Sequence, residues 1–542
     1  MWPDKAQYRP GEQVTLQAVP GERVLVTELG HPVASLPVEG GVARWTAPEG
    51  LERSARGFRA RAVDGSGRTL ASTAFDVAHH WSLAPRYGFL SDFKPSDTAD
   101  AVEGLCRLHL NVVQYYDWMY THYQYFAEGD EFVDPLGRPT SHRVVRERIE
   151  AGHRRGIAAL AYGSLYGGEK PVAEAHPEWL LYDGNGQPFH LIDLFYIQNI
   201  ERGCGWREWI IDQYEEAVRR LGFDGIHIDQ YGFPKRALYR PEPGEERVVD
   251  MTAAFPDFVA EACRRLRAVK PEGGSIFNCV NNWPVEQIAP LREDSATYIE
   301  VWSPHDQYRD LHELVRYARA IGPHKQVILS AYLKPFHREA ERPAGALAGL
   351  KLATAAINAA GGYHLLLGEE NGVLADAYYP MYGLLSAEDL AVVQGYYDFL
   401  VANEALLHDL DLRDVSNTWS GGFDAETREA NFHGPVGFSP QAEPGKVWVI
   451  ARERPGRRVF HLINLTGLEH GQWNSAQPEP LQVEGIELVI ARFGPLKGVW
   501  CASPDDGGEP ERLDFEATED GKPYVRIRLP RLSVWNLVWT EE

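Results

Sequence analysis

The chain of 542 residues has no clustered run of Lys and Arg, and its formal net charge is −23. Nucleic-acid binding needs basic side chains gathered on one face to neutralise phosphates, so this composition argues against a nucleic-acid partner. No apolar run approaches the length that crosses a bilayer, and we therefore expect no membrane partner. A neutral or small partner fits this balance best.

A secretory signal would show a basic segment followed by an apolar one, and the first residues of the chain do not have this pattern. We therefore expect a cytoplasmic protein. A secreted protein whose signal peptide is absent from this sequence is the alternative.

Cysteine is also scarce. The five cysteines lie far apart and show no Cys-x-x-Cys or Cys/His ligand spacing, so the sequence predicts neither a disulfide framework nor a zinc site. The glycine pairs at 167–168 and 361–362 are turn or hinge glycines and do not form a phosphate-binding loop. We expect buried reduced thiols, no metal and no cofactor.

Aromatic residues, by contrast, make up 11% of the chain, with 15 Trp and 25 Tyr. Several of them cluster near carboxylates in the sequence. Aromatic rings stack on flat, weakly polar ligands such as sugars, although most rings in a protein belong to its core. The pattern is compatible with a sugar-binding site.

The length of the chain favours about three domains. Short alternating runs separated by Pro-Gly and Gly-Gly punctuation predict a small β-sandwich over residues 1–80. Residues 81–412 alternate apolar strand runs with amphipathic helices, which is typical of a (β/α)8 TIM barrel. Short alternating strands return over 413–542 and predict a C-terminal β-sandwich. Support of the barrel and carbohydrate binding are both open roles for the two β-domains.

The barrel prediction depends on eight strands with helices between them. The expected strands are 87–90, 111–116, 157–162, 225–229, 275–279, 297–301, 326–331 and 363–367, and the expected helices are 97–108, 144–155, 207–221, 252–269, 308–321, 345–360 and 388–402. The longest loop, 163–204, follows the third strand. A loop of that length in a compact domain is usually functional.

The fourth strand ends in a carboxylate, Asp229. Period-2 alternation places Phe223, Gly225, His227 and Asp229 on one face of this strand. In a parallel β/α barrel the carboxyl ends of the strands carry the catalytic groups, so Asp229 is a candidate catalytic residue. An Asp that only caps the following turn is the alternative at this point.

A second carboxylate, Glu300, lies on the sixth strand between Tyr298 and Trp302 on the same strand face. Such surroundings raise the pKa of a carboxyl group by desolvation, as a general acid requires. The fourth and sixth strands are both even-numbered, and alternate strands contribute side chains to the same layer inside a barrel. Asp229 and Glu300 can therefore face each other. Cleavage of a glycosidic bond needs two such carboxyl groups. A Glu paired with a buried Arg is the alternative.

Several segments are specific when taken together: 114–122 (QYYDWMYTH), 191–194 (LIDL), 222–229 (GFDGIHID), 277–278 (FN), 298–302 (YIEVW) and 378–380 (YYP). With them the chain resembles glycoside hydrolase family 66, the dextranases and cyclodextran-forming glucanotransferases, over nearly its whole length. The resemblance implies an N-terminal immunoglobulin-like domain, a catalytic (β/α)8 barrel and a C-terminal β-sandwich. It also implies a retaining mechanism on α-1,6-linked glucose polymers, with Asp229 as nucleophile and Glu300 as acid/base.

Further residues are candidates for binding the substrate. Asp117 and Asn278 end the second and fifth strands, and His122 and Asp193 lie on loops at the same barrel mouth. A purely structural hydrogen bond is the alternative for each. His227, Tyr298 and Trp302 flank the two carboxylates and complete the set. His227 and Asp229 form an H-x-D pair, but no second His pair supports a metal site.

The sequence therefore predicts a dextranase-like, retaining endo-acting or oligosaccharide-trimming enzyme that needs no cofactor and takes an α-glucan or an isomaltooligosaccharide. A glucanotransferase that forms cyclic isomaltooligosaccharides is the first alternative. Relatives that resemble that enzyme carry an additional carbohydrate-binding module inserted in the barrel. No β-rich insertion of that kind is visible in this sequence. A non-catalytic glucan-binding protein and a metal-dependent barrel hydrolase are the others.

Overall fold

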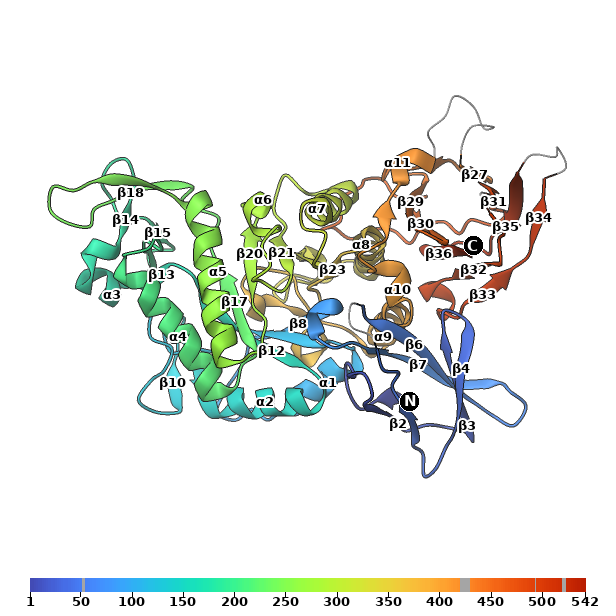
Figure 1. The fold of residues 1–542 in the computed structure, drawn as a ribbon, viewed down its shortest axis with the longest axis horizontal. Coiled ribbons are helices and arrows are strands. Elements are labelled where there is room, and N and C mark those ends of the chain that lie inside the picture. The colour runs from blue at the N-terminus through green and yellow to red at the C-terminus, as the bar shows by residue number, and fades with distance from the viewer. Residues whose placement is uncertain (51–53, 420–428, 493, 519–522) are drawn as a thin grey trace.

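The computed structural model describes residues 1–50, 54–419, 429–492, 494–518 and 523–542. A β-rich N-terminal part and a β-rich C-terminal part lie on one side of a central part in which strands and helices alternate (Figure 1). The expected multidomain fold, a barrel with a β-domain before and after it, is confirmed. The last N-terminal strand ends at Val77, and the first strand of the C-terminal part begins at Arg413. The domain boundaries themselves remain a prediction.

The N-terminal domain consists of two antiparallel sheets, with strand orders β1-β2-β5 and β4-β3-β6-β7. Burial alternates along β2 (Gln13–Gln17), as expected for a strand with one face on a core. Rings from both sheets, among them Trp45, Phe58 and Phe75, meet in a single core. The remaining strands are β1 (Trp2–Pro3), β3 (Arg23–Glu28), β4 (His31–Pro37), β5 (Ala43–Thr46), β6 (Arg56–Val63) and β7 (Thr69–Val77).

The central sheet has eight parallel strands that pair in chain order. A parallel bridge between Phe89 and Gly368 joins the first strand to the segment after the last, which closes the ring. The strands are β8 (Tyr87–Leu90), β9 (Val112–Tyr115), β12 (Ala158–Ser164), β17 (Gly225–Asp229), β20 (Ile276–Val280), β21 (Thr297–Glu300), β22 (Val327–Ser330) and β23 (Tyr363–His364). All eight expected strands are present; 87–90 and 225–229 match at both ends, and the ends of the others differ by at most three residues.

Seven long helices surround these strands, as the sequence predicts: α1 (Ala101–Arg107), α2 (His142–Arg154), α4 (Gly205–Leu221), α5 (Met251–Val269), α7 (Tyr308–Ile321), α8 (Ala346–Ala360) and α9 (Ala387–Ala402). Helix α4 ends where Gly222 adopts the left-handed conformation (φ 88°), which aims the chain back into β17. Helix α8 is buried nearly all round, because it lies between the barrel and β30 (Arg457–Asn464) of the C-terminal domain.

Successive side chains of a barrel strand point alternately into the barrel and toward the helices. His227 packs with Tyr298 inside the ring, whereas Ile226 and Ile228 join the outer core beneath the helices. Phe223 was expected on the face of Asp229, and this is wrong: its ring packs on Trp118 in the outer core. Regular alternation starts only at Gly225, because the preceding residues belong to the turn that follows α4.

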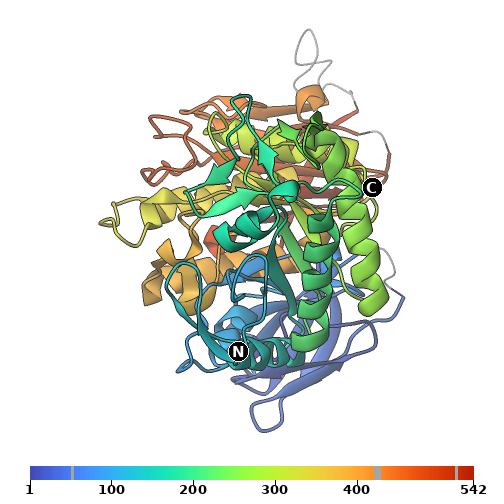
Figure 2. The same cartoon turned by 90° about the vertical axis from the view of Figure 1, so that its left-hand side faces the viewer.

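The long loop after β12 folds into structure of its own. Its strands β13 (Gly167–Glu169), β15 (His190–Leu191) and β16 (Phe195–Ile197) form one sheet, and β14 (Leu181–Tyr182) pairs with β18 (Arg236–Tyr239), which pairs with β19 (Arg247–Asp250). The connections after the third and fourth barrel strands therefore build one cover. Figure 2 views the molecule from the side of this cover.

Further short elements are β10 (Glu131–Val133), β11 (Pro139–Ser141), α3 (Lys170–Ala175), α6 (Val285–Ile288), β24 (Gly372–Val373), β25 (Gly383–Leu384), α10 (Glu404–Leu407) and α11 (Ser416–Trp419).

The C-terminal domain is a second sandwich. A seven-stranded sheet, β26-β29-β30-β36-β32-β33 with β28 on β29, packs on a four-stranded sheet, β27-β31-β35-β34. The strands other than β30 are β26 (Arg413–Asp414), β27 (Ala430–His433), β28 (Phe438–Ser439), β29 (Val447–Arg454), β31 (Glu487–Ala491), β32 (Gly498–Ala502), β33 (Glu511–Leu513), β34 (Phe515–Ala517), β35 (Tyr524–Arg528) and β36 (Trp535–Glu541).

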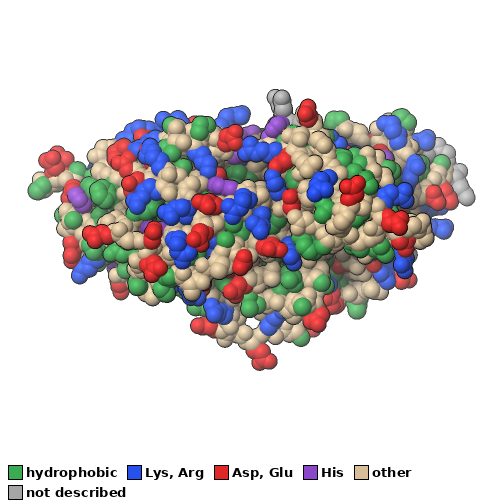
Figure 3. All heavy atoms as spheres, turned by 90° about the horizontal axis from the view of Figure 1, so that it is seen from below, with side chains coloured by type: hydrophobic (Ala, Val, Ile, Leu, Met, Phe, Trp, Pro, Cys, Tyr) green, Lys and Arg blue, Asp and Glu red, His purple; other side chains and the backbone are tan. Residues whose placement is uncertain are grey.

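On the face drawn in Figure 3, acidic and basic side chains are interspersed, and neither sign gathers into one patch. We find no helix in the described part of the chain with the length and hydropathy needed to cross a membrane. The five cysteines are all buried and unpaired.

Candidate active site

Asp229 ends β17 with its carboxylate inside the barrel mouth. Its Oδ1 accepts a hydrogen bond from Asn278 Nδ2 at 2.7 Å, and its Oδ2 accepts one from the Tyr162 hydroxyl at 3.0 Å. These donors come from the neighbouring strands β20 and β12. They hold the carboxylate in one orientation at the position where barrel enzymes carry their chemistry. Asp229 is therefore more than a turn cap.

Glu300 ends β21 and is 8% exposed. Its Oε1 accepts from the Tyr332 hydroxyl at 2.6 Å, and its Oε2 accepts from Asn278 Nδ2 at 2.9 Å. Its partners are thus neutral donors and do not include the buried Arg of the alternative interpretation. A carboxyl group without a cation partner in such a site can hold a proton.

The same nitrogen, Asn278 Nδ2, bridges the two carboxyl groups. Because Asp229 Oδ1 and Glu300 Oε2 both hydrogen-bond to it, these two oxygens lie less than about 6 Å apart. The structure therefore brings together the three residues that the sequence placed at the ends of the fourth, fifth and sixth strands.

Burial and proximity act on both acids. Burial raises the pKa of Asp229, and the charge of Glu300 raises it further. Burial likewise raises the pKa of Glu300, while the hydrogen bonds from Tyr332 and Asn278 partly offset the effect. Two like charges this close disfavour double ionisation, which favours a state of the pair with one proton.

A second charged cluster lies beside the pair. His122 bridges two carboxylates, with Nδ1 3.0 Å from Glu169 and Nε2 3.4 Å from Asp117. Burial lowers the pKa of His122, but the hydrogen bonds with Asp117 and Glu169 raise it to about 9, so the imidazolium form is favoured. Arg138 pairs with Asp117 at 3.2 Å. The ring of His122 lies 5.9 Å from that of Tyr162, which connects this cluster to Asp229.

His227 and Tyr298 lie beneath the carboxyl pair. Both are almost fully buried, and their rings meet edge to face at 4.7 Å. Nδ1 of His227 is 3.0 Å from the Tyr87 hydroxyl, and burial lowers the pKa of His227 to about 3, which keeps the imidazole neutral. We find no group of three or more His, Cys, Asp or Glu side chains placed to hold a metal ion in the described ranges.

Trp302 and Asp193 differ from the other candidates in their exposure. Trp302 is 42% exposed, with its ring 5.7 Å from that of Tyr332, so it presents an aromatic face at the barrel mouth. The side chain of Asp193 is 91% exposed and pairs with His190 at 3.1 Å. It lies in the turn of the β15–β16 hairpin, where Ile192 and Asp193 both have positive φ, and it is not brought to the carboxyl pair.

Four residues of the site are not among those that the sequence predicts: Tyr162, Tyr332, Glu169 and Arg138. Tyr162 lies near the end of β12, and Tyr332 follows β22 by two residues. The strand-end rule that found Asp229 could have identified both tyrosines. Glu169 comes from the short strand β13 of the long loop, and no sequence pattern predicted that it would reach His122.

The arrangement combines two close carboxyl groups, both with a raised pKa, and fixed donors on each acid. Such a pair can protonate a leaving oxygen and attack the carbon to which that oxygen is bound.

Comparisons with known proteins agree with this description. A family model described as "Glycosyl hydrolase family 66" matches residues 3–539. A cycloisomaltooligosaccharide glucanotransferase from Niallia circulans is 23% identical over 706 aligned positions, which cover 99% of this chain and 71% of that protein. A dextranase from Streptococcus salivarius is 24% identical over 560 positions, covering 88% of this chain and 66% of that protein.

A solved structure supports the fold. The crystal structure of a Paenibacillus cycloisomaltooligosaccharide glucanotransferase, complexed with cycloisomaltoheptaose, superposes with a TM-score of 0.86 at 21% identity and covers 99% of both chains. At this identity the likeness concerns the arrangement of the three domains.

Proposed function

The chain belongs to glycosyl hydrolase family 66, and on that premise we propose that it hydrolyses α-1,6-glucosidic linkages in dextran or isomaltooligosaccharides with retention of configuration. The observation that carries the proposal is the Asn278 bridge, which holds Asp229 and Glu300 close enough to act on one bond. The names of the relatives, a dextranase and glucanotransferases of isomaltooligosaccharides, supply the linkage.

The reaction proceeds in two steps. In the first, Glu300 donates its proton to the glycosidic oxygen, that oxygen leaves with the bonding pair, and Asp229 attacks the anomeric carbon to form a glycosyl ester. In the second, Glu300 takes a proton from water, the resulting hydroxide attacks the anomeric carbon, and the Asp229 carboxylate leaves. Each residue ends in its starting protonation state.

The separation of the two acids supports the retaining course. Carboxyl groups in retaining enzymes lie about 5–5.5 Å apart, whereas inverting enzymes keep roughly 6.5–9.5 Å between them to admit a water molecule. A single nitrogen that bonds to both acids leaves little room for such a water. Tyr162 and Tyr332 fix the outer oxygens, so that attack and protonation approach the substrate from defined directions.

Formation of cyclic isomaltooligosaccharides is the second candidate, because it uses the same two acids. One observation favours hydrolysis. The alignment with the glucanotransferase spans 706 positions against the 542 residues of this chain, so that relative carries segments that this chain lacks. Inserted segments can supply contacts for the long acceptor strand that ring formation requires.

The test is incubation with dextran, isomaltooligosaccharides, starch and pullulan, followed by separation of the products by size. Asp229→Asn serves as the matched control for contaminating activity. We expect linear α-1,6 fragments from dextran and no products from starch. Cyclic products in excess would favour the transferase, and binding without cleavage by the wild type would favour a non-catalytic glucan-binding protein.

A further inference from the structure

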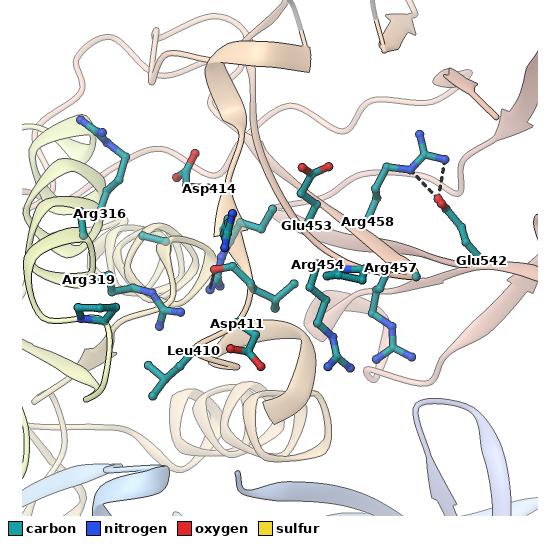
Figure 4. Close-up of a pocket in the computed structure, with 18 residues that line it drawn as sticks. Arg316, Arg319, Leu410, Asp411, Asp414, Glu453, Arg454, Arg457, Arg458 and Glu542 are labelled. Carbon is teal, nitrogen blue, oxygen red and sulfur yellow. Dashed lines mark hydrogen bonds and ion pairs between the residues drawn. The ribbon is translucent and has the colours of Figure 1, made fainter. Parts of the chain in front are cut away.

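An open cavity of about 1170 Å3 lies where the barrel meets the C-terminal domain (Figure 4). Its walls come from helix α7, from the segment between α10 and β26, and from the hairpin of β29 and β30. None of the described residues that line it belongs to the carboxyl pair or to the His122 cluster. It is therefore distinct from the active site.

The cavity is rich in arginine although the chain is strongly acidic. Seven arginines and four acidic residues line it: Arg316, Arg319, Arg413, Arg452, Arg454, Arg457 and Arg458 against Asp411, Asp414, Glu453 and Glu542. Two of these acids are already engaged, since Glu542 pairs with Arg458 at 2.6 Å and Asp414 with His312 at 2.6 Å. The lining thus carries an excess of positive charge.

Two of the arginines have a structural role. Arg319 donates to the backbone carbonyls of Gly361 and Asp409, at 3.1 and 2.8 Å. Arg452 donates to the carbonyls of Leu407 and Leu412. Gly361 follows the C-terminus of α8 and Leu407 ends α10, so both guanidinium groups satisfy carbonyls at helix ends. These contacts use neutral carbonyls, and the carboxylates of Asp409 and Asp414 act on both guanidinium groups through their charge. Burial, with the nearby Arg319, lowers the pKa of Arg452 to about 9.

Arg454 and Arg457 remain available for a ligand. They are direct cross-strand partners in the β29–β30 hairpin, on either side of its two-residue turn, and like charges in that position destabilise a sheet. Arg454 pairs with Asp409 at 3.2 Å. The side chain of Arg457 has no hydrogen bond or ion pair with any described residue, and the Nε atoms of both arginines are buried without a partner. Figure 4 shows the two guanidinium groups projecting side by side in the same direction.

We propose that this cavity binds a small molecule that carries a phosphate group, with Arg454 and Arg457 as its main contacts. A phosphate dianion would balance the two neighbouring positive charges, and its oxygens would accept hydrogen bonds from the guanidinium groups. The planar fork of a guanidinium group matches phosphate geometry, and two adjacent forks select for an anion with several acceptor oxygens. The volume lies slightly above the range of about 300–1,000 Å3 that is typical of small-molecule sites, so a sugar phosphate or a nucleotide has room to enter.

The test is isothermal titration of the whole chain with inorganic phosphate, pyrophosphate, glucose 6-phosphate and citrate, each at an ionic strength held constant with sodium chloride. We expect saturable binding of at least one phosphate compound and weaker binding of citrate. Arg457→Gln and Arg454→Gln should each weaken phosphate binding by about tenfold or more, because each removes charge-assisted hydrogen bonds.

Arg264→Gln is the matched control. Arg264 is exposed on helix α5 and the same charge is removed, so affinity should stay as in the wild type. Thermal unfolding of every variant shows whether it is folded. If Arg457→Gln is unstable, Arg457→Lys replaces it in the test. This variant keeps the positive charge but lacks the planar guanidinium group, so it should still weaken phosphate binding. No saturable binding of any phosphate compound, equal affinity for citrate, or equal losses in the Arg457 and Arg264 variants would each overturn the proposal.

Discussion

Asn278 Nδ2 lies 2.7 Å from Asp229 Oδ1 and donates its hydrogen bond from the middle of the neighbouring strand β20. Because the same amide reaches Glu300, one neutral side chain sets both the separation and the orientation of the two acids. An amide is suited to this position, since it donates to carboxylates without adding a charge that would suppress the proton on the pair.

The first prediction concerns the nucleophile. Asp229→Asn should lower kcat on dextran by at least about three orders of magnitude, because the covalent step has no substitute group. The thermal unfolding midpoint should stay close to that of the wild type. Initial-rate kinetics and circular dichroism on the same preparation check both points. Near-wild-type turnover by the folded variant would remove Asp229 from this role.

The matched variant for Asp229 is Asp224→Asn, five residues earlier on the same segment. Asp224 lies outside the barrel, where its carboxylate pairs with Lys270 at 2.6 Å and His153 at 2.8 Å and accepts from Ala159 N at 2.7 Å. We expect a loss of about 1.5–3 kcal/mol in the free energy of unfolding, with kcat preserved. Loss of activity in a stable Asp224→Asn protein would place the nucleophile on the other face of the strand.

This contribution of Asp224 should depend on pH. Burial raises its pKa, but the bonds with His153 and Lys270 outweigh burial and keep it below its ordinary value of 3.8. A depressed folded pKa means that the stabilisation is fully present above 3.8 and is lost as the pH falls through the folded value. Unfolding in denaturant at a series of pH values measures this. The free energies of unfolding of the wild type and of Asp224→Asn should approach each other only in acid.

Glu300→Gln tests the acid/base role. The variant should be nearly inactive on dextran but should still form the glycosyl ester from substrates with good leaving groups, which need no protonation. Small anions such as azide should accelerate the second step, because they attack without a general base. Equal losses on both substrate types, with no rescue by azide, would argue against this role.

Asn278→Ala should shift the pH profile. The hydrogen bonds from Asn278 lower the pKa of both Asp229 and Glu300, so their removal raises both, and both limbs of the profile of kcat/KM should move to higher pH. We also expect a loss of about 100-fold at the optimum. Tyr332→Phe is the control: it removes a donor from Glu300 alone, and only the alkaline limb should move. A shift of Asn278→Ala to lower pH would contradict the bridging role.

The last prediction concerns stereochemistry. Two displacements at the anomeric carbon retain its configuration, so fresh hydrolysate of an α-1,6-glucan should contain the α-anomer before mutarotation. Proton NMR within the first minutes of reaction resolves the two anomers. A β-anomer as first product would mean that water attacks directly, as in inverting enzymes, and would overturn the proposed nucleophilic role of Asp229.

The sequence by itself determined the fold and the two central acids. Strand periodicity is local, so the eight barrel strands could be recognised one by one, and the order of strands and helices left a parallel ring as the consistent arrangement. Asp229 and Glu300 followed from the same local pattern, since each ends a strand on its inward face.

Only the tertiary structure decided what surrounds these acids. Tyr162 and Asn278 lie on β12 and β20, and Tyr332 follows β22 by two residues. Their hydroxyl and amide groups meet the acids because parallel register aligns these parts of the strands in space. Asp193 illustrates the opposite outcome. Its motif resembled a site segment, but the turn of the β15–β16 hairpin directs its carboxylate into solvent. The direction of a loop side chain depends on the packing of the whole loop, whereas periodicity along a sequence reports only which side of its own strand a residue occupies.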